Sequence, residues 1–171
     1  NPAVKDFNPL RIGWVSQTAS HNTVVVDGRS MDADTASAAI GRLRLLASER
    51  PVRVVDADGV GPGLYPGVRT FRRLLCMVDV DDDSSYVVDV FWVRGGAVHC
   101  LVQNGGAPEA AVEAAVVAEQ PEGTYAGAEI PYGTFFDGRY AHGYRGAGFQ
   151  FLTRVSRSCG PVTAGTVTWP I

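Results

Sequence analysis

The chain has 171 residues, of which 46% are hydrophobic and 19% are charged, so it holds enough apolar material for one domain with a core. Its 15 basic and 18 acidic residues give a net charge of −3, which argues against a general nucleic-acid binder. No apolar run approaches roughly 18 residues, so the sequence predicts no membrane-spanning helix. The 3 cysteines exclude a fully paired disulfide framework.

Short apolar runs separated by turn residues follow one another along the chain and predict β-strands. The β-branched run Thr23–Val26 ends at Asp27-Gly28, a dipeptide typical of a hairpin turn. The acidic segment Asp81–Ser85 separates two longer runs and indicates an antiparallel hairpin. The predicted strands lie within residues 21–30, 50–56, 68–80, 85–94, 96–104 and 148–170. We therefore predict an all-β fold, an antiparallel β-sandwich formed as a single domain over residues 1–171.

Two segments fit a helix as well as a strand. Asp34–Ser48 begins with an acidic N-cap residue and has apolar side chains at helical spacing. Pro108–Glu119 starts with a proline, which the first helical turn tolerates, and is rich in alanine. The sequence leaves both alternatives open, and one or two short helices would be compatible with a sandwich.

Histidines are the first candidates for chemistry. His21 precedes the strand at Thr23–Val26, beside polar neighbours. At this position the sequence leaves three roles open for the imidazole: general acid/base, metal ligand, or a structural side chain hydrogen-bonded to backbone groups. His99 lies in a predicted strand next to Cys100, and adjacent strand residues point to opposite faces. These two side chains are therefore not predicted to bind one metal ion together, and Cys100 is expected to be a small buried hydrophobic residue.

A glycine-rich loop near residue 140 combines aromatic residues with Arg139 and His142. Aromatic rings stack on sugar rings, and arginine binds a carboxylate through two hydrogen bonds. The loop is either a carbohydrate-binding loop or an ordinary packed loop. The acidic residues at 79–83 lack the spacing of a helix–loop–helix calcium site and are predicted to form a solvated turn.

The segment Ser20–Gly28 resembles the "HNTVxVDG" signature of the heparinase II/III-like polysaccharide lyases. Other segments of the chain follow in the order of that family's β-domain. They are Asn8–Leu10, Trp14, Tyr65–Val68, Arg72-Arg73, Tyr86–Phe91, Gly95-Gly96 before His99, Pro131–Gly133, Gly148–Leu152 and Trp169. The resemblance covers nearly the whole chain and rests on the ordered set rather than on one element.

The resemblance implies the supersandwich-like β-domain of a longer, multidomain lyase whose N-terminal α/α toroid is not included in this sequence. Such enzymes cleave uronic-acid-containing polysaccharides, like heparan sulfate, heparin or alginate, by β-elimination. The resemblance thus implies an acidic polysaccharide as partner and a periplasmic or secreted location. The chain starts at Asn1 and ends inside a predicted strand, so we expect a piece of a longer protein or a mature form. Because most catalytic groups of the family lie on the toroid, the isolated chain is expected to be inactive.

The resemblance also implies roles for single residues, although this chain departs from the family's pattern at two positions. Several members carry a histidine two places before the one matched by His21, where this chain has Ala19, and another four places after the one matched by His99, where it has Gln103. The resemblance implies His21 as acid/base or zinc ligand and Asn22 as a substrate-binding residue. It also implies Asp34 and His99 as ligands of a structural zinc, with Asp32 as the alternative to Asp34. Arg139 and His142 are predicted to bind substrate because of the composition of their loop.

Three functions follow from this reading. The first is the β-domain of a uronate polysaccharide lyase. The second is a non-catalytic carbohydrate-binding or scaffold module of the same ancestry. The third is a protein-interaction module without a glycan role.

Overall fold

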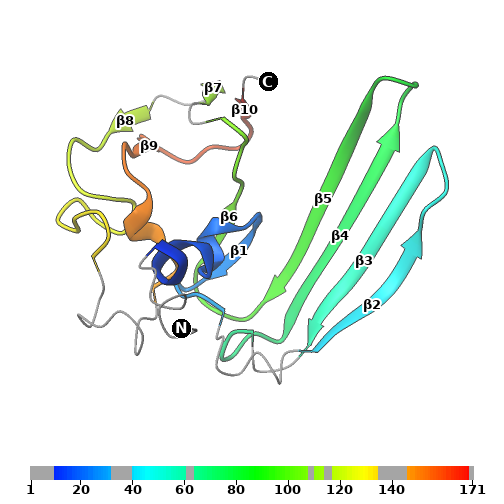
Figure 1. Ribbon diagram of the computed structural model, residues 1–171, viewed down its shortest axis with the longest axis horizontal. Coiled ribbons are helices and arrows are strands. Elements are labelled where there is room, and N and C mark those ends of the chain that lie inside the picture. Colours follow the sequence, from blue (N-terminus) through cyan, green and yellow to red (C-terminus); the bar gives the residue numbers. More distant parts are fainter. Residues whose placement is uncertain are drawn as a thin grey trace, which may run out of the picture. The chain divides into compact units, whose positions relative to one another are not determined.

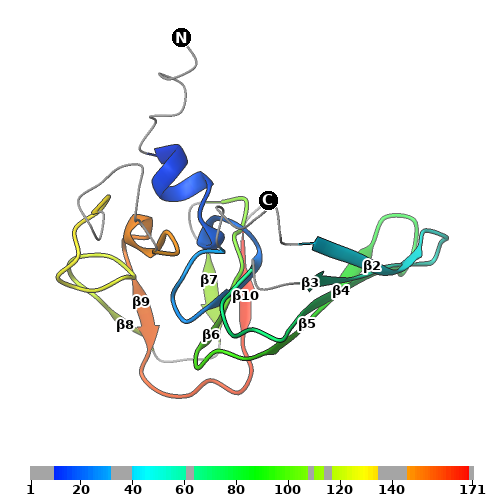
Figure 2. The same cartoon turned by 90° about the horizontal axis from the view of Figure 1, so that it is seen from below.

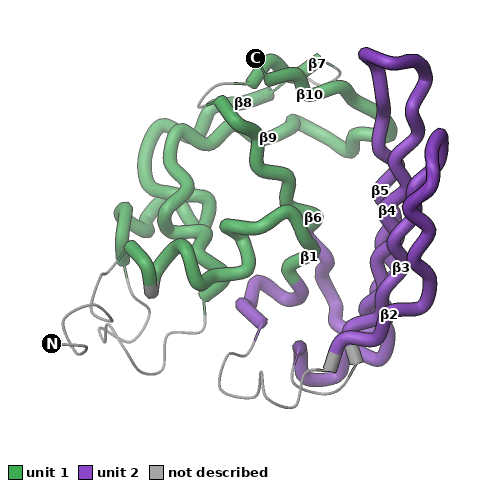
Figure 3. The backbone as a smooth tube through the Cα atoms, turned by 45° about the vertical axis from the view of Figure 1, so that its right-hand side comes forward, with its two compact units in different colours: residues 1–25, 101–171 green, residues 26–100 purple. Residues whose placement is uncertain are grey.

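The chain forms two compact units, of which the first is made of two separate stretches of sequence and the second of one (Figure 3). The first unit comprises residues 1–25 and 101–171, and the second comprises Val26–Cys100. This computed structural model describes residues 10–31, 40–60, 64–107, 110–113, 117–134 and 146–169.

The second unit contains a four-stranded antiparallel sheet (Figures 1 and 2). Its strands follow one another in sequence order: β2 (Ile40–Ala47), β3 (Val52–Val60), β4 (Thr70–Asp79) and β5 (Ser85–Arg94). The predicted strands at 50–56, 68–80 and 85–94 correspond to β3, β4 and β5. Such a meander forms because consecutive period-2 segments have similar lengths, and the connections 48–51 and 80–84 are short turns.

The acidic segment between β4 and β5 forms the predicted hairpin turn. Asp81 Oδ1 accepts hydrogen bonds from the backbone N–H groups of Asp83 (2.9 Å) and Ser84 (2.7 Å). An aspartate that closes its own turn in this way replaces the hydrogen bonds that the strand ladder no longer supplies. The carboxylates of Asp81–Asp83 are exposed, in line with a solvated turn.

The segment 34–48 was compatible with a helix, and its described part is a strand instead. Ile40–Ala47 pairs with β3 along its length, with a bulge between Leu43 and Leu45. Arginines and leucines alternate through residues 42–45. The alternation puts Arg42 beside its cross-strand partner Asp58, and pairing of this kind outweighs a moderate helix propensity.

Aromatic packing at one end of the sheet supplies the core of the second unit. Phe71 on β4 lies between Tyr65 and Phe91, with ring centroids 5.9 Å and 6.2 Å apart. Tyr65 is 2% exposed and Phe71 is 9% exposed. Tilted and edge-on rings at these distances are a favourable arrangement for aromatic side chains.

The first unit is built from short strand pairs. β7 (Ala111–Glu113) pairs with β10 (Thr166–Thr168), and β8 (Val117–Glu119) pairs with β9 (Ser156–Ser158). β1 (Thr23–Val26) pairs with β6 (His99–Val102), and the chain passes from one unit to the other within these two strands. Short helical turns accompany them in the described part of the unit: η1 (Arg11–Val15), η2 (Thr18–Ser20) and η4 (Phe149–Phe151).

Two further segments of the chain differ from their predicted secondary structure. Pro108–Glu119 fitted a helix, yet its described residues include strands β7 and β8. Each pairs with a distant segment, and that pairing satisfies the backbone groups that a helix would have satisfied locally. The predicted strand region 148–170 starts with the 3-10 turn Phe149–Phe151, whose N-cap Gly148 has φ 96°.

The predicted all-β, antiparallel, sandwich-like fold class is confirmed. The three cysteines are free, so no disulfide contributes to the fold. Among the described residues, no helix has the length and apolar character needed to cross a membrane.

Candidate functional site

His21 lies at the end of η2, immediately before β1. It adopts an extended conformation (φ −118°, ψ 153°), and its backbone N–H donates to the carbonyl of Thr18 at 3.1 Å. The residue is exposed. Within the described part of the chain, its imidazole makes no hydrogen bond or ion pair. The ring is therefore available to solvent or to a ligand, whereas its backbone is fixed.

The residues before His21 hold that backbone in place. Ala19 is fully buried and donates its N–H to the carbonyl of Ala147 at 2.9 Å. The hydroxyl of Ser20 donates its one hydrogen to the carbonyl of Gln17 (2.8 Å), with the carbonyl of Val15 (3.1 Å) as a second acceptor within reach. An exposed side chain on an anchored backbone is the usual arrangement for a residue that acts on a ligand.

The side chain of Asn22, the predicted substrate-binding residue next to His21, is hydrogen-bonded within the chain. Its Oδ1 accepts a hydrogen bond from the backbone N–H of Asn104 at 2.6 Å. The amide of Asn104 in turn donates to the carbonyl of Ala19 at 3.4 Å. Asn22 thus links the start of β1 to the segment that follows β6.

The end of the signature segment, Asp27-Gly28, forms a tight turn. Both residues have positive φ (51° and 65°), as a type I′ hairpin turn requires. Asp27 Oδ1 accepts hydrogen bonds from the N–H groups of Val98 and Ala97, both at 2.8 Å. These bonds, that from Val98 first, hold the pKa of the Asp27 carboxyl below its usual value. Asp27-Gly28 thus has a structural role in this segment: the turn was predicted from the sequence, whereas the bonds from Ala97 and Val98 to Asp27 were not.

His99, a predicted zinc ligand, has a partner of its own. Its Nε2 lies 2.7 Å from the carbonyl oxygen of Gly95. His99 and Leu101 are exposed whereas Cys100 and Val102 are half-buried, as the alternation in β6 predicts. Among the described residues, no three His, Cys, Asp or Glu side chains form a group that would hold a metal ion. Asp34, Asp32, Arg139 and His142 lie outside the described residues, so the zinc and loop assignments stay predictions.

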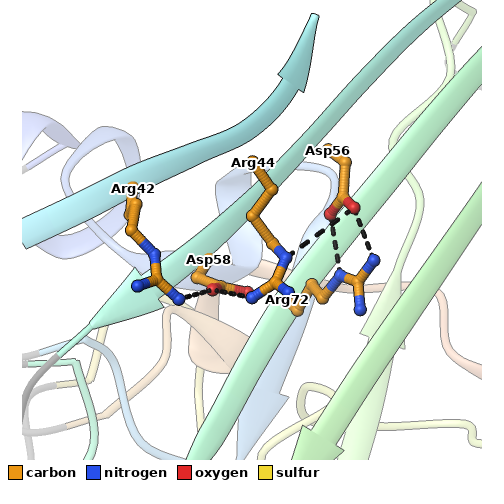
Figure 4. A network of polar contacts seen from close by, with 5 residues as sticks. All are labelled: Arg42, Arg44, Asp56, Asp58 and Arg72. Carbon is orange, nitrogen blue, oxygen red and sulfur yellow. Dashed lines mark hydrogen bonds and ion pairs between the residues drawn. The ribbon is translucent and has the colours of Figure 1, made fainter.

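A second group of polar residues, missed by sequence reasoning, lies on the four-stranded sheet (Figure 4). Asp58 lies between Arg42 (3.0 Å) and Arg44 (2.7 Å). Asp56 accepts two hydrogen bonds from Arg72, at 2.8 Å from Nε and 2.5 Å from Nη2. Arg44 Nε is also 4.0 Å from Asp56, which makes the five residues one connected network.

The register explains why these side chains meet. Arg42, Asp58, Arg72 and Trp92 are direct cross-strand partners on four successive strands, so they lie on one face of the sheet. Arg72 Cζ lies 4.5 Å from the centre of the Trp92 ring. We call Arg42, Arg44, Asp56, Asp58, Arg72 and Trp92 the arginine face. The sequence did contain a signal for the arginine face. Two pairs of charged residues in strand-like segments are spaced two apart, which puts the members of each pair on one face: Arg42 with Arg44, and Asp56 with Asp58.

The network changes the acidity of its carboxyls. Hydrogen bonds from Arg72 hold the pKa of Asp56 below its usual value, although desolvation opposes this effect. Hydrogen bonds from Arg44 and then Arg42 lower the pKa of Asp58. Both carboxylates therefore remain ionised and keep the guanidinium groups oriented.

A pocket of about 330 Å³ opens beside this network. Arg42, Arg44, Arg72, Asp58, Arg69 and Thr70 line it on the polar side. Its volume falls at the lower end of the range of small-ligand sites, roughly 300–1,000 Å³.

No protein-family model matches the sequence, and neither a curated protein nor a solved structure matches the chain.

Proposed function

We propose that this chain is the β-domain of a lyase that cleaves uronic-acid-containing polysaccharides by β-elimination. The observation that carries the proposal is His21, an exposed imidazole on a fixed backbone at the start of β1, within the segment that resembles the lyase signature. The proposal includes an N-terminal α/α toroid in the same protein, an acidic glycan as substrate and a periplasmic or secreted location.

In this proposal His21 exchanges a proton with the substrate or holds a zinc ion at the domain's edge. β-Elimination removes the proton at C5 of the uronate and breaks the bond between C4 and its oxygen, which leaves with a proton. A histidine has a pKa near neutrality and suits either transfer. The toroid supplies the remaining groups, including the one that neutralises the uronate carboxylate.

The alternative is a carbohydrate-binding module without catalytic activity. One observation favours it: within the described residues, no side chain orients the His21 imidazole, whereas a general base is commonly fixed by a second group.

An activity assay separates these two functions. The full-length protein that contains this chain is incubated with alginate, heparan sulfate and a neutral glucan, and the ultraviolet absorbance of 4,5-unsaturated uronate ends is followed. The lyase proposal predicts absorbance with at least one uronate polymer and none with the glucan. Glycan binding without new unsaturated ends would support the alternative instead.

A further inference from the structure

The arginine face and its pocket carry an excess of positive charge. Asp56 and Asp58 are shared by three arginines, and Arg69 adds a fourth guanidinium to the pocket lining. In the part of the chain that the structure describes, the Arg69 side chain has no carboxylate partner. Four positive charges thus face two negative ones, and a pocket with this balance favours an anionic ligand.

The guanidinium groups are held ready for such a ligand. Arg72 is fixed on one side by two hydrogen bonds to Asp56, which is 5% exposed, and on the other by the ring of Trp92. Arg42 and Arg44 are both bound to Asp58, yet their side chains remain 66% and 41% exposed. Each guanidinium has five N–H donors, so donors remain for a ligand once the aspartates are satisfied. Fixing these groups in advance lowers the entropic cost of binding.

The pocket also has apolar surface suited to a sugar ring. Leu64 and Val68 supply apolar side chains to its lining. Trp92, beside Arg72, is 42% exposed. A Cβ atom at Gly59 would overlap the side chain of Leu64, so the absence of a side chain at this position lets Leu64 pack directly against β3. A wall of this kind accommodates the C–H groups of a pyranose, whose charged group the arginines would bind.

We propose that this pocket binds an acidic sugar residue, with Arg69, Arg42 and Arg44 on its oxyanion. The oxyanion is a carboxylate or a sulfate, since arginine binds both through paired N–H donors. The site is separate in sequence from His21 and serves to hold the glycan rather than to cleave it. The inference rests on the proposed function in one respect: that function is the reason why we choose a sugar as the molecule that bears the oxyanion.

Calorimetric titration of the 171-residue chain tests the inference with three trisaccharides. They are an oligogalacturonate, which carries carboxylates, a sulfated maltotriose and unmodified maltotriose. We expect binding of one or both charged sugars and none of the neutral one. Binding of the galacturonate alone assigns the site to uronates, and binding of the sulfated sugar alone assigns it to sulfated glycans. Equal binding of the neutral sugar, or no binding of any of them, would overturn the inference.

Matched arginine variants locate the site. Arg69→Gln is expected to weaken binding of the charged sugar by at least about tenfold, because it removes a charged hydrogen-bond donor. Arg50→Gln is the control, since Arg50 lies beside the same sheet but is bound to Asp79 next to the acidic turn. Equal affinities for Arg69→Gln and the unsubstituted chain, with circular dichroism showing both folded, would contradict the site.

The inference and the proposed function fail separately. Binding at this pocket in a protein without lyase activity would overturn only the proposed function. The opposite outcome is lyase activity in the full-length protein, with Arg69→Gln and Arg42→Gln changing neither that activity nor the affinity for the charged sugar. That result would overturn only this inference.

Discussion

The guanidinium of Arg72 lies 4.5 Å from the centre of the Trp92 ring, its direct partner on the neighbouring strand. The same guanidinium donates two hydrogen bonds to Asp56 on the strand at its other side. One side chain on β4 therefore connects β3 with β5. On the opposite face Arg73 also combines a carboxylate with an aromatic ring, but both belong to β5: it donates two hydrogen bonds to Asp89 and lies 4.6 Å from the centre of the Phe91 ring.

Stability should fall at acid pH because of these ion pairs. The pKa values of Asp56 and Asp58 are lowered in the folded state, so below about pH 4 the unfolded chain, whose aspartates titrate near pH 3.9, binds more protons. The free energy of unfolding should stay level above that pH and decrease as the pH falls through the folded-state pKa values. Urea titrations between about pH 3 and about pH 7, a range that includes the aspartate reference pKa of about 3.9, measure this decrease.

The double variant Asp56→Asn, Asp58→Asn is the control for that pH dependence. We expect it to be less stable at neutral pH and to lose less stability on acidification. A pH dependence identical to that of the unsubstituted chain would mean that other carboxyls account for the effect.

Removing the central aromatic ring of the second unit should be costly. Phe71→Ala leaves a cavity between Tyr65 and Phe91 and should lower the free energy of unfolding by about 3–5 kcal/mol. Tyr86→Ala, at a position 53% exposed on the same sheet, should change it by only about 0.5 kcal/mol. Chemical denaturation of both variants checks this difference, and equal losses would contradict the placement of the core.

The turn at Gly28 provides a test of backbone conformation alone. Gly28 has φ 65°, and a Cβ atom there would meet nothing within 4 Å, so Gly28→Ala should cost about 1–2 kcal/mol through strain and not through a clash. Gly160→Ala is the matched control, because this position is equally open and its φ lies outside the positive region. It should be neutral or slightly stabilising. Similar thermal stability of the two variants would argue against the turn.

The strands and turns that local chemistry specifies were predictable. The β4–β5 hairpin follows from period-2 segments around Asp81–Ser85, and the turn at Asp27-Gly28 follows from its dipeptide. The segments at 40–47, 111–113 and 117–119 were not decided locally. Their strand state depends on pairing with residues far along the chain, such as Asp58 for Arg42.

The arginine face was beyond sequence reasoning for the same reason. Strand spacing shows that Arg42 and Arg44 share a direction, but only the register shows that Asp58, Arg72 and Trp92 lie beside Arg42. Likewise, Asp27 was predicted as a turn residue, whereas its bonds to Ala97 and Val98 connect positions about 70 residues apart.

The isolated chain should have no lyase activity. The groups that neutralise the carboxylate and complete proton transfer are expected on a toroid that this sequence does not contain, and β-elimination needs all of them placed together. Incubation of the 171 residues with alginate or heparan sulfate should give no 4,5-unsaturated uronate, measured by ultraviolet absorbance. Appearance of that chromophore would show that this chain holds a complete active site.

The most direct test of the central claim is the turnover rate of the full-length protein with His21→Ala. Loss of a general acid/base or of a metal-held ligand should lower kcat on the order of a hundredfold or more. Zinc content and thermal stability, measured on the same samples, separate the two roles, because loss of a metal ligand should lower both. A variant that turns over at the rate of the unsubstituted enzyme, with unchanged zinc content, would show that His21 takes no part in the reaction.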